Sequence, residues 1–365
     1  MAGRAAITSV TATAFTIPTD APESDGTLAW DATTIVVVEA AGGGCVGIGY
    51  SYADASSADL IRRVLAPVVT GREALGVSGC WVAMRAAVRN IGRAGIASHA
   101  ISAVDTALWD LKARLLGVSL LDLLGASRDA VPVYGSGGFT SCSVAELEAQ
   151  LSGWVASGIR RVKMKVGREP ALDAGRVEAA RRAIGDAELF VDANGAYTVR
   201  GALTQAERFA ESGVTWLEEP VASADVEGLR FIRTRAPAGM EIAAGEYGYD
   251  LDDFRRLLDA GAVDVLQADV TRCGGYTGML RVDALCAAHN VQLSTHTAPL
   301  LHAPFACAAP AVRHVEYFHD HVRIERLLFD GVPAPENGML RPDRSRPGLG
   351  VEFRRADAGR FLVAP

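Results

Sequence analysis

The sequence predicts an α/β protein, a modified (β/α)₈ barrel with an α+β N-terminal capping domain that the C-terminal segment completes. Three observations lead to this prediction. Eight short apolar, β-prone runs alternate with amphipathic segments in the second part of the chain. A hairpin pattern and a long helical region precede them, and a tail with several prolines follows. We expect the capping domain at residues 1–125, the barrel at 126–328 and the returning segment at 329–365.

The length and composition are typical of a packed globular chain. Hydrophobic residues make up 49% of the 365 residues and charged residues 22%, and this length allows about two domains. The net charge of −7 disfavours nucleic acid and anionic membranes as partners. Apolar runs stop well short of the roughly 18 residues of a membrane span, and the N-terminus has no signal-peptide pattern. Six dispersed cysteines without a C-x-x-C pair favour free thiols and a cytoplasmic location.

The capping domain begins with a predicted hairpin. Residues 33–40 are rich in β-branched side chains, and a glycine-rich turn leads into a second strand at 42–49. The spacing of Gly42, Gly44 and Gly47 also matches a dinucleotide-binding motif. Strand-like residues follow the glycines where that motif requires a helix, so we interpret the run as a hairpin turn. From position 59 to 124 the apolar spacing predicts helices.

The barrel prediction depends on strict alternation of strands and helices. Parallel strands joined by helical crossovers close into a barrel, and active sites lie at the C-terminal ends of its strands. The last crossovers are short, which predicts a modification of the barrel there, and the tail is expected to fold back on the capping domain. The predicted strands are 131–134, 161–166, 189–192, 215–218, 242–246, 263–269, 291–296 and 312–318, and the helices include 144–156, 171–184, 198–212 and 252–260.

One titratable residue lies at the end of each of seven successive predicted strands. Because these ends are neighbours around one mouth of a barrel, we expect the seven side chains to share a site. A single residue of this kind is usually a helix cap or a solvated group, but a full ring of them favours a catalytic site. In chain order the residues are Lys165, Asp192, Glu218, Glu246, Asp269, His296 and Glu316.

Three carboxylates come from consecutive strands of this ring. Asp192, Glu218 and Glu246 are hard oxygen ligands in the number that suits Mg²⁺. Without a cation, three clustered carboxylates would repel one another and raise each other's pKa. We therefore predict a magnesium site, with Asn194 close enough to ligate or to bind substrate.

Two lysines form a pair on one strand. Of the 36 basic residues only three are lysines, and Lys163 and Lys165 are two positions apart, so they point to the same face of the strand. Their mutual repulsion is expected to lower the pKa and to make a base near neutral pH. We assign Lys165 as that base and Lys163 as a ligand for a substrate carboxylate oxygen.

A second base is expected on the far side of the mouth. A carboxylate at Asp269 would orient the ring of His296 and leave its other nitrogen free to move protons. Glu316, if protonated, would donate to the developing negative oxygen of the substrate. A metal site with a base on each flank fits the removal of a proton from the carbon next to a carboxylate, because the resulting charge needs electrostatic stabilisation.

The motifs around these residues resemble the enolase superfamily, specifically the mandelate racemase subgroup. The resemblance implies a modified TIM barrel, one Mg²⁺ per subunit on Asp192, Glu218 and Glu246, two bases (Lys165 and the His296–Asp269 pair), Glu316 as electrophile and a homo-oligomer. It also implies that capping-domain loops at 15–30 and 49–52 select the substrate. The motifs are K-M-K at 163–165, V-D-A-N-G at 191–195, L-E-E-P at 217–220, A-G-E at 244–246, Q-A-D at 267–269, S-T-H at 294–296 and V-E-Y-F at 315–318, and the expected substrate-binding residues are Asn194, Asp20, Asp25, Trp30 and Tyr50.

Three functions remain open at this point. The first is Mg²⁺-dependent removal of the α-proton through a metal-stabilised enediolate, followed by dehydration of an acid sugar or polyhydroxy acid. The second is a racemase or epimerase of a 2-hydroxy acid, which uses the same residues. The third is a barrel of another class. It is either a non-catalytic barrel that binds a small acid, which the intact ring disfavours, or a phosphate-binding aldolase-type barrel, which is disfavoured because the last two predicted strands lack glycine-rich phosphate turns. A further H-D-H run at 319–321 is interpreted as local structure and not as a second metal site.

Overall fold

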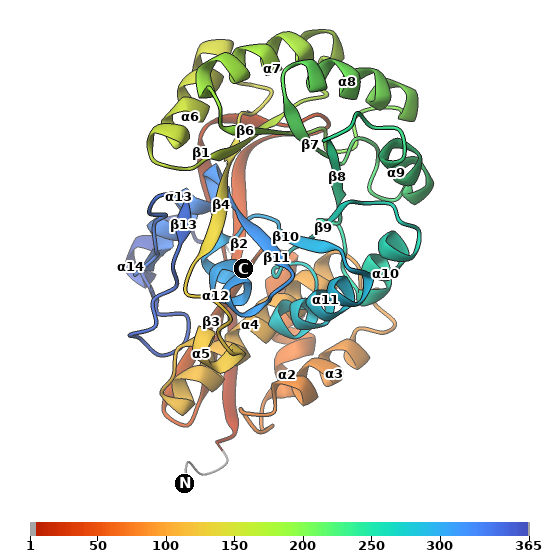
Figure 1. Ribbon diagram of the computed structural model, residues 1–365. Coiled ribbons are helices and arrows are strands. Elements are labelled where there is room, and N and C mark those ends of the chain that lie inside the picture. Colours follow the sequence, from red (N-terminus) through yellow and green to blue (C-terminus); the bar gives the residue numbers. More distant parts are fainter. Residues whose placement is uncertain (1–4, 364–365) are drawn as a thin grey trace.

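Eight parallel strands close into a barrel in the computed structural model, which describes residues 5–363 (Figure 1). The ring closes where Val315 and Phe318 of the last strand pair with Val133 and Ser136 of the first. Every strand overlaps one of the eight predicted runs, so the predicted barrel is confirmed. The strands are β4 (Val131–Gly137), β5 (Arg161–Lys165), β6 (Glu188–Asp192), β7 (Val214–Glu218), β8 (Glu241–Ala244), β9 (Val265–Ala268), β10 (Gln292–Thr295) and β11 (Val312–Phe318).

Helices surround the barrel, and local signals in the sequence set where they begin. Ser143 and Glu146 form a capping box at the start of the first of them, and Pro170 occupies the first turn of the second. The helices are α6 (Val144–Ala156), α7 (Pro170–Ile184), α8 (Val199–Glu211), α9 (Val226–Arg233), α10 (Leu251–Asp259), α11 (Gly275–His289), α12 (Pro299–Ala308) and α13 (His319–Leu328).

Aromatic side chains fill the barrel interior below the mouth. Tyr134, Phe190 and Trp216 form a separate buried cluster with two small aliphatic residues, and the rings of Phe190 and Trp216 stack with centroids 5.1 Å apart. The interior is therefore a packed core with no channel, and the polar strand ends lie above it.

The capping domain consists of a three-stranded antiparallel sheet on a helical layer. The strands are β1 (Ile7–Ser24), β2 (Ala29–Gly42) and β3 (Cys45–Tyr52). The loop expected at 15–30 is different in the structure, because residues 15–24 lie in β1 and only 25–28 connect it to β2. The helical layer comprises α1 (Ser56–Leu60), a π-helical segment (Ile61–Leu65), α2 (Ala66–Val69), α3 (Val77–Ala87), α4 (Ile96–Leu116) and α5 (Leu120–Leu124).

The glycine-rich run has two structural roles and no dinucleotide-binding helix follows it. Gly43 and Gly44 have φ of 57° and 81°, as a two-residue hairpin turn with both residues in the left-handed region requires. A Cβ at Gly47 would lie 2.2 Å from the Ala107 carbonyl oxygen. The sheet therefore packs directly on α4, and the hairpin interpretation is confirmed.

The C-terminal segment returns to the capping domain. The backbone N–H of Val363 donates to the Ala14 carbonyl, Phe353 packs on Phe15 with ring centroids 5.7 Å apart, and Arg355 forms an ion pair with Glu39. The segment contains β12 (Phe329–Asp330), β13 (Met339–Leu340), β14 (Glu352–Phe353), α14 (Arg355–Ala358) and a 3₁₀ turn (Gly359–Phe361). The first four and last two residues of the predicted domains lie outside the described part of the chain.

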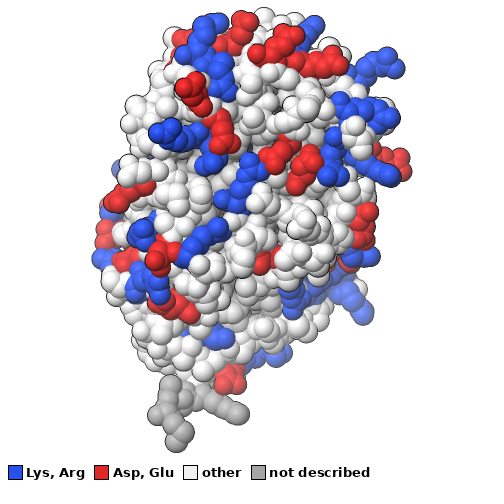
Figure 2. All heavy atoms as spheres, in the orientation of Figure 1, with Lys and Arg blue, Asp and Glu red and all other residues white. Residues whose placement is uncertain are grey.

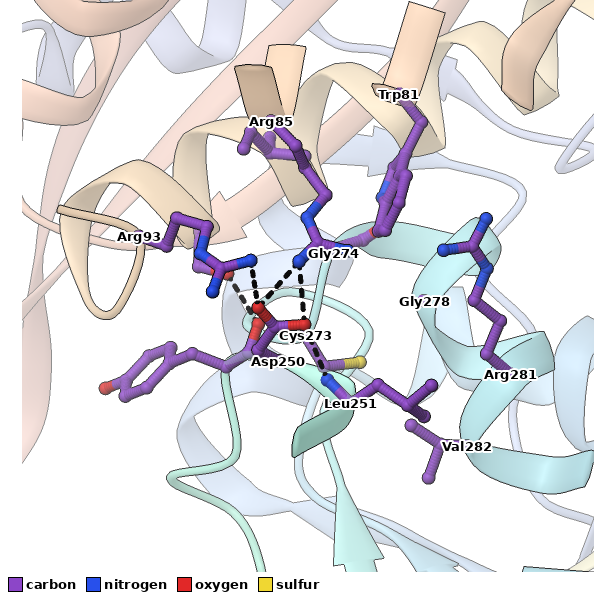
Figure 3. Close-up of a pocket in the computed structure, with 13 residues that line it drawn as sticks. Trp81, Arg85, Arg93, Asp250, Leu251, Cys273, Gly274, Gly278, Arg281 and Val282 are labelled. Atoms are coloured by element: carbon purple, nitrogen blue, oxygen red, sulfur yellow. Dashed lines mark hydrogen bonds and ion pairs between the residues drawn. The ribbon is translucent and has the colours of Figure 1, made fainter. Parts of the chain in front are cut away.

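Arginines of the capping domain bind the start of a barrel helix. Figure 3 shows Arg85 and Arg93 converging on Asp250, the N-cap residue of α10, with nitrogen–oxygen distances of 2.7 and 2.5 Å. Beside them, the Trp81 ring lies between the guanidinium groups of Arg85 and Arg281, at 4.4 and 4.1 Å from the ring centroid. These contacts fix the capping domain against the barrel on the side of α10 and α11.

The surface in the view of Figure 2 carries acidic and basic side chains intermixed. None of the helices in the described residues 5–363 combines the length and apolar character needed to cross a membrane. The six cysteines are free.

Candidate active site

A cavity of about 460 Å³ lies between the barrel mouth and the capping domain. The barrel contributes Lys165, Glu246, His296 and Glu316 to its lining, and Asn194 lies beside them. The capping domain forms the opposite wall. The strand ends therefore meet at one site, as parallel strands in a closed barrel require.

Three carboxylates form the base of this site. One oxygen each of Asp192, Glu218 and Glu246 lies within 4.8 Å of the others, and all three side chains are buried. Burial and the neighbouring Asp192 raise the pKa of Glu218 well above its usual range. Burial opposes ionisation of Asp192 as well, but the ammonium groups of Lys165 and Lys163 outweigh it and bring the pKa to about 2.

These residues fit a divalent cation. The Oε2 atom of Glu246 and the Oδ1 atom of Asn194 are buried and accept no hydrogen bond, although buried polar atoms are normally paired. Hard carboxylate and amide oxygens are the ligands that Mg²⁺ prefers. A cation among the three carboxylates would also relieve their mutual repulsion.

The two lysines occupy different positions in the site. The Lys163 ammonium is 2.5 Å from Glu218 Oε1 and 2.8 Å from Glu316 Oε1, and the side chain is fully buried. It is not among the residues that line the cavity, but it contacts Glu316, which is among them, and its expected role as a ligand for a substrate carboxylate oxygen stays a prediction. The Lys165 ammonium is 2.5 Å from Asp192 Oδ2 and does line the cavity.

The expected lowering of the lysine pKa is not found. Burial would lower the pKa of both ammonium groups, but the carboxylates around them outweigh it and raise the pKa of each. The reason is distance: Lys165 is in contact with Asp192, and Lys163 with Glu218. Repulsion between the lysines is the weaker effect.

A histidine and an aspartate form a pair on the neighbouring strand ends. His296 Nδ1 lies 2.8 Å from Asp269 Oδ2, and His296 Nε2 lies 3.3 Å from Glu246 Oε2. Burial opposes ionisation of Asp269, but the hydrogen bond from His296 outweighs it and lowers the pKa. The pair fixes the ring so that Nδ1 faces the aspartate and Nε2 faces the site.

Glu316 is an acceptor in this arrangement. Its Oε1 atom binds Lys163, and its Oε2 atom accepts a hydrogen bond of 2.7 Å from the Thr297 backbone N–H. Burial would raise the pKa of Glu316, but Lys163 outweighs it and the pKa lies below the usual range. The charges therefore favour the ionised form over the protonated donor expected from the sequence.

Sequence reasoning missed Arg272. This guanidinium donates to the Glu246 carbonyl at 3.1 Å and lies 3.4 Å from Glu246 Oε1 and 3.6 Å from Asp269 Oδ2. It thus connects a predicted metal ligand to the histidine's partner. Its position three residues after Asp269 was the available signal, but loop residues have no periodicity that fixes their direction.

The expected substrate-binding residues divide into two groups. Asp25, Trp30 and Asn194 line the cavity. Tyr50 does not reach it, because the side chain is fully buried and its hydroxyl donates to Glu325 at 2.6 Å. Asp20 lies outside the lining and interacts with His319 instead, at 2.9 Å.

The H-D-H run takes part in local contacts. The Asp320 carboxylate accepts a hydrogen bond from Thr33 and pairs with Arg323. The ring of His321 stacks on Tyr52. A ring nitrogen of His319 lies within 4.8 Å of carboxylate oxygens of Asp20 and Glu23, a grouping that could also hold a metal ion, so the interpretation of the run as local structure stays a prediction.

Comparison with known families covers most of the chain. Residues 9–125 match the family described as mandelate racemase / muconate lactonizing enzyme, N-terminal domain. Residues 146–358 match the family described as enolase C-terminal domain-like.

Curated relatives include enzymes of sugar acids. The chain is 35% identical to 3,6-anhydro-alpha-L-galactonate cycloisomerase of Streptomyces coelicolor over 329 residues, which cover 88% of this chain and 89% of that one. It is 32% identical to L-talarate/galactarate dehydratase of Salmonella typhimurium over 281 residues, which cover 75% of this chain and 70% of that one.

Solved structures share the fold over nearly the whole chain. A mandelate racemase/muconate lactonizing enzyme-like protein from Rubrobacter xylanophilus is 55% identical with a TM-score of 0.96, covering 98% of this chain and 100% of that one. L-talarate/galactarate dehydratase from Salmonella typhimurium, liganded with Mg and L-lyxarohydroxamate, is 27% identical with a TM-score of 0.90. The match covers 99% of this chain and 94% of that one.

Proposed function

Because the chain belongs to the mandelate racemase/muconate lactonizing enzyme family of the enolase superfamily, we propose that it is a Mg²⁺-dependent sugar-acid dehydratase. It removes the proton α to the carboxylate and expels the β-hydroxyl as water. The observation that carries this proposal is the cluster of three buried carboxylates, of which Glu246 lines the cavity together with the two nitrogen bases. The curated relatives named as dehydratases and cycloisomerases of sugar acids support it.

Asp192, Glu218 and Glu246 are the residues that would hold the metal. Mg²⁺, when bound there, supplies positive charge that stabilises the deprotonated substrate and offsets the carboxylates that now raise the pKa of Lys165. Arg272 positions Glu246 through its carbonyl and carboxylate. Lys163 and Glu316 neutralise each other beneath the site, and the Glu316 carboxylate also anchors the backbone of Thr297.

Two bases reach the cavity from different strands. Lys165 on β5 and His296 after β10 both line it. Either Lys165 Nζ or His296 Nε2 takes the α-proton, and protonated His296 donates to the leaving hydroxyl, which departs as water. Asp269 stabilises the protonated ring of His296 that these two proton transfers require.

An epimerase or racemase is the second candidate, and the placement of the two bases supports it. If the second base returns the proton to the opposite face, the same residues invert the α-carbon. A racemase from Streptomyces coelicolor with bound magnesium is 33% identical, with a TM-score of 0.90. The leaving group of the substrate decides between the two reactions. A cytoplasmic location and a homo-oligomer remain parts of the proposal.

The proposal is tested with a panel of sugar acids and 2-hydroxy acids, including ring-closed forms, in D₂O with Mg²⁺. Proton NMR follows exchange at C2 and formation of 2-keto-3-deoxy acids. A dehydratase gives the keto acid, and an epimerase gives deuterium at C2 of both epimers. The absence of both signals across the panel would contradict the proposed function.

A further inference from the structure

A fixed carboxylate lies in the part of the cavity wall that the capping domain forms. Asp25 lines the cavity and belongs to the short connection between β1 and β2. Its Oδ1 atom accepts hydrogen bonds from the backbone N–H groups of Thr27 and Leu28 at 2.6 and 2.7 Å. The Thr140 hydroxyl ties the carbonyl of Asp25 to the barrel at 2.9 Å. The negative charge is therefore held in one place.

A second carboxylate lies on the same wall, after β3. Asp54 lines the cavity, and its Oδ1 atom accepts the backbone N–H of Ser56 at 2.9 Å. The hydroxyl-bearing residues nearby, Thr33 and Thr34, are uncharged. The capping-domain wall thus carries two carboxylates and two hydroxyls beside apolar side chains such as Leu28 and Trp30.

The positive charges in the cavity belong to the barrel. Among the described residues that line it, the basic ones are Lys165, Arg272 and the histidines His296 and His321. Lys165 contacts Asp192, and Arg272 lies between Glu246 and Asp269. Burial lowers the pKa of His321 well below its usual value, so this side chain adds no positive charge to the wall near neutral pH.

This distribution distinguishes the two ends of a bound sugar acid. Lys165 and the predicted Mg²⁺ site supply positive charge for one carboxylate. At the other end, on the capping-domain wall, a substrate hydroxyl would donate a hydrogen bond to a carboxylate such as Asp25. A second carboxylate there would lose water and face like charges without a partner, which is how binding sites reject the wrong ligand.

We infer that the substrate is a monocarboxylic sugar acid, open-chain or ring-closed, whose far end carries hydroxyls, and that Asp25 selects against sugar diacids. The inference rests on the proposed function, because that function places the reacting carboxylate at the metal site. It narrows the expectation that capping-domain loops select the substrate to one residue, Asp25, and to one distinction, monoacids against diacids.

The test compares sugar monoacids with diacids that share each configuration from C2 to C5. Gluconate with glucarate and galactonate with galactarate are two such pairs. With Mg²⁺ present, we expect kcat/KM for the reactive monoacid to exceed that of its matched diacid by about 100-fold or more. A diacid that reacts as well as its monoacid overturns the inference and leaves the proposed function intact. No exchange and no product with any acid overturns the proposed function itself.

The variant Asp25→Asn removes the negative charge of this side chain and keeps its size. The amide oxygen still accepts from Thr27 and Leu28, so the turn is kept, and the amide N–H₂ donates to a carboxylate. We expect the ratio of diacid to monoacid kcat/KM to rise about 10-fold or more. Asp31→Asn is the matched control, since Asp31 is exposed on β2 and outside the cavity lining. In this control the ratio of diacid to monoacid kcat/KM should equal that of the wild type. An unchanged ratio in Asp25→Asn contradicts the role of this residue.

Discussion

At the scale of single residues, pairing of opposite charges governs the site. Lys165 is matched to Asp192 and Lys163 to Glu218 and Glu316. These pairs explain why so many ionised groups are buried together, because an unpaired buried charge would be far more costly. They also leave Lys165 and His296 as the nitrogen bases that line the cavity.

Replacing either base should abolish turnover while the fold is kept. We expect Lys165→Ala and His296→Asn each to lower kcat by about 10³-fold or more, the range that general bases contribute. Steady-state kinetics on the substrate found in the D₂O panel measures the loss, and circular dichroism checks the fold. Lys112→Ala, on α4 and outside the cavity lining, is the matched control and should keep full turnover. If both active-site variants stay fully active, the two-base assignment is wrong.

One buried carboxyl should make stability depend on pH. Burial raises the pKa of Glu325 to about 8 from 4.5, so the folded protein holds a proton that the unfolded chain releases. The stabilisation is complete below the unfolded pKa and is lost as the pH rises through 8. The free energy of unfolding should thus fall more steeply from pH 5 to 8 in the wild type than in Glu325→Gln. Denaturant titrations at several pH values measure this, and parallel curves would refute it.

The residue-level site was largely predictable because strand ends can be located in the sequence. The strands that carry Lys165, Asp192 and Glu218 end at those residues. The environment of each group was not predictable, since it depends on side chains far apart in the chain. The pKa of Lys165, the buried position of Lys163 and the contacts of Arg272 are of this kind. The catalytic roles stay predictions until variants are measured.

At the scale of elements, a side chain of the capping domain caps a barrel helix that has no N-cap side chain of its own. Helix α11 has Gly274 as its N-cap residue and no side-chain cap of its own. Asp105 of α4 supplies the cap instead. Its carboxylate accepts a hydrogen bond of 2.9 Å from the Thr277 backbone N–H and one of 2.6 Å from the Thr277 hydroxyl. A capping-domain helix therefore completes a barrel helix.

Removing that carboxylate should destabilise the protein strongly. Asp105→Ala leaves the buried N–H and hydroxyl of Thr277 without their acceptor, so we expect a loss of about 2–4 kcal/mol in the free energy of unfolding. Asp105→Asn retains an acceptor and should lose less. Chemical denaturation measures both, with Asp59→Ala, an exposed ion-pair residue, as the control. A loss no larger than that of the control would contradict the capping role.

Some elements were harder to predict than others. Helix α4 lies in the region 59–124 for which helices are expected, and it could be predicted because its apolar spacing is regular. Strand β1 was missed, since its many threonines and two prolines do not give an alternating apolar pattern. Its pairing along β2 is what makes it a strand.

At the scale of the whole molecule, the site lies between two domains. The barrel supplies the reacting groups and the capping domain supplies the opposite wall. The returning C-terminal segment binds the capping domain through Val363 and Arg355. Alternation in the sequence predicted the barrel, but the domain contacts around Asp250 (Figure 3) join residues more than a hundred positions apart and have no local pattern.

The central claim is that Asp192, Glu218 and Glu246 together bind one Mg²⁺. Calorimetric titration of chelator-treated protein with Mg²⁺ tests it most directly, with Glu218→Gln measured in parallel. We expect one site per chain in the wild type, loss of most of that affinity in the variant, and turnover that disappears with chelation and returns with Mg²⁺. A wild type that binds no Mg²⁺, or a variant that binds it equally well, would contradict the account.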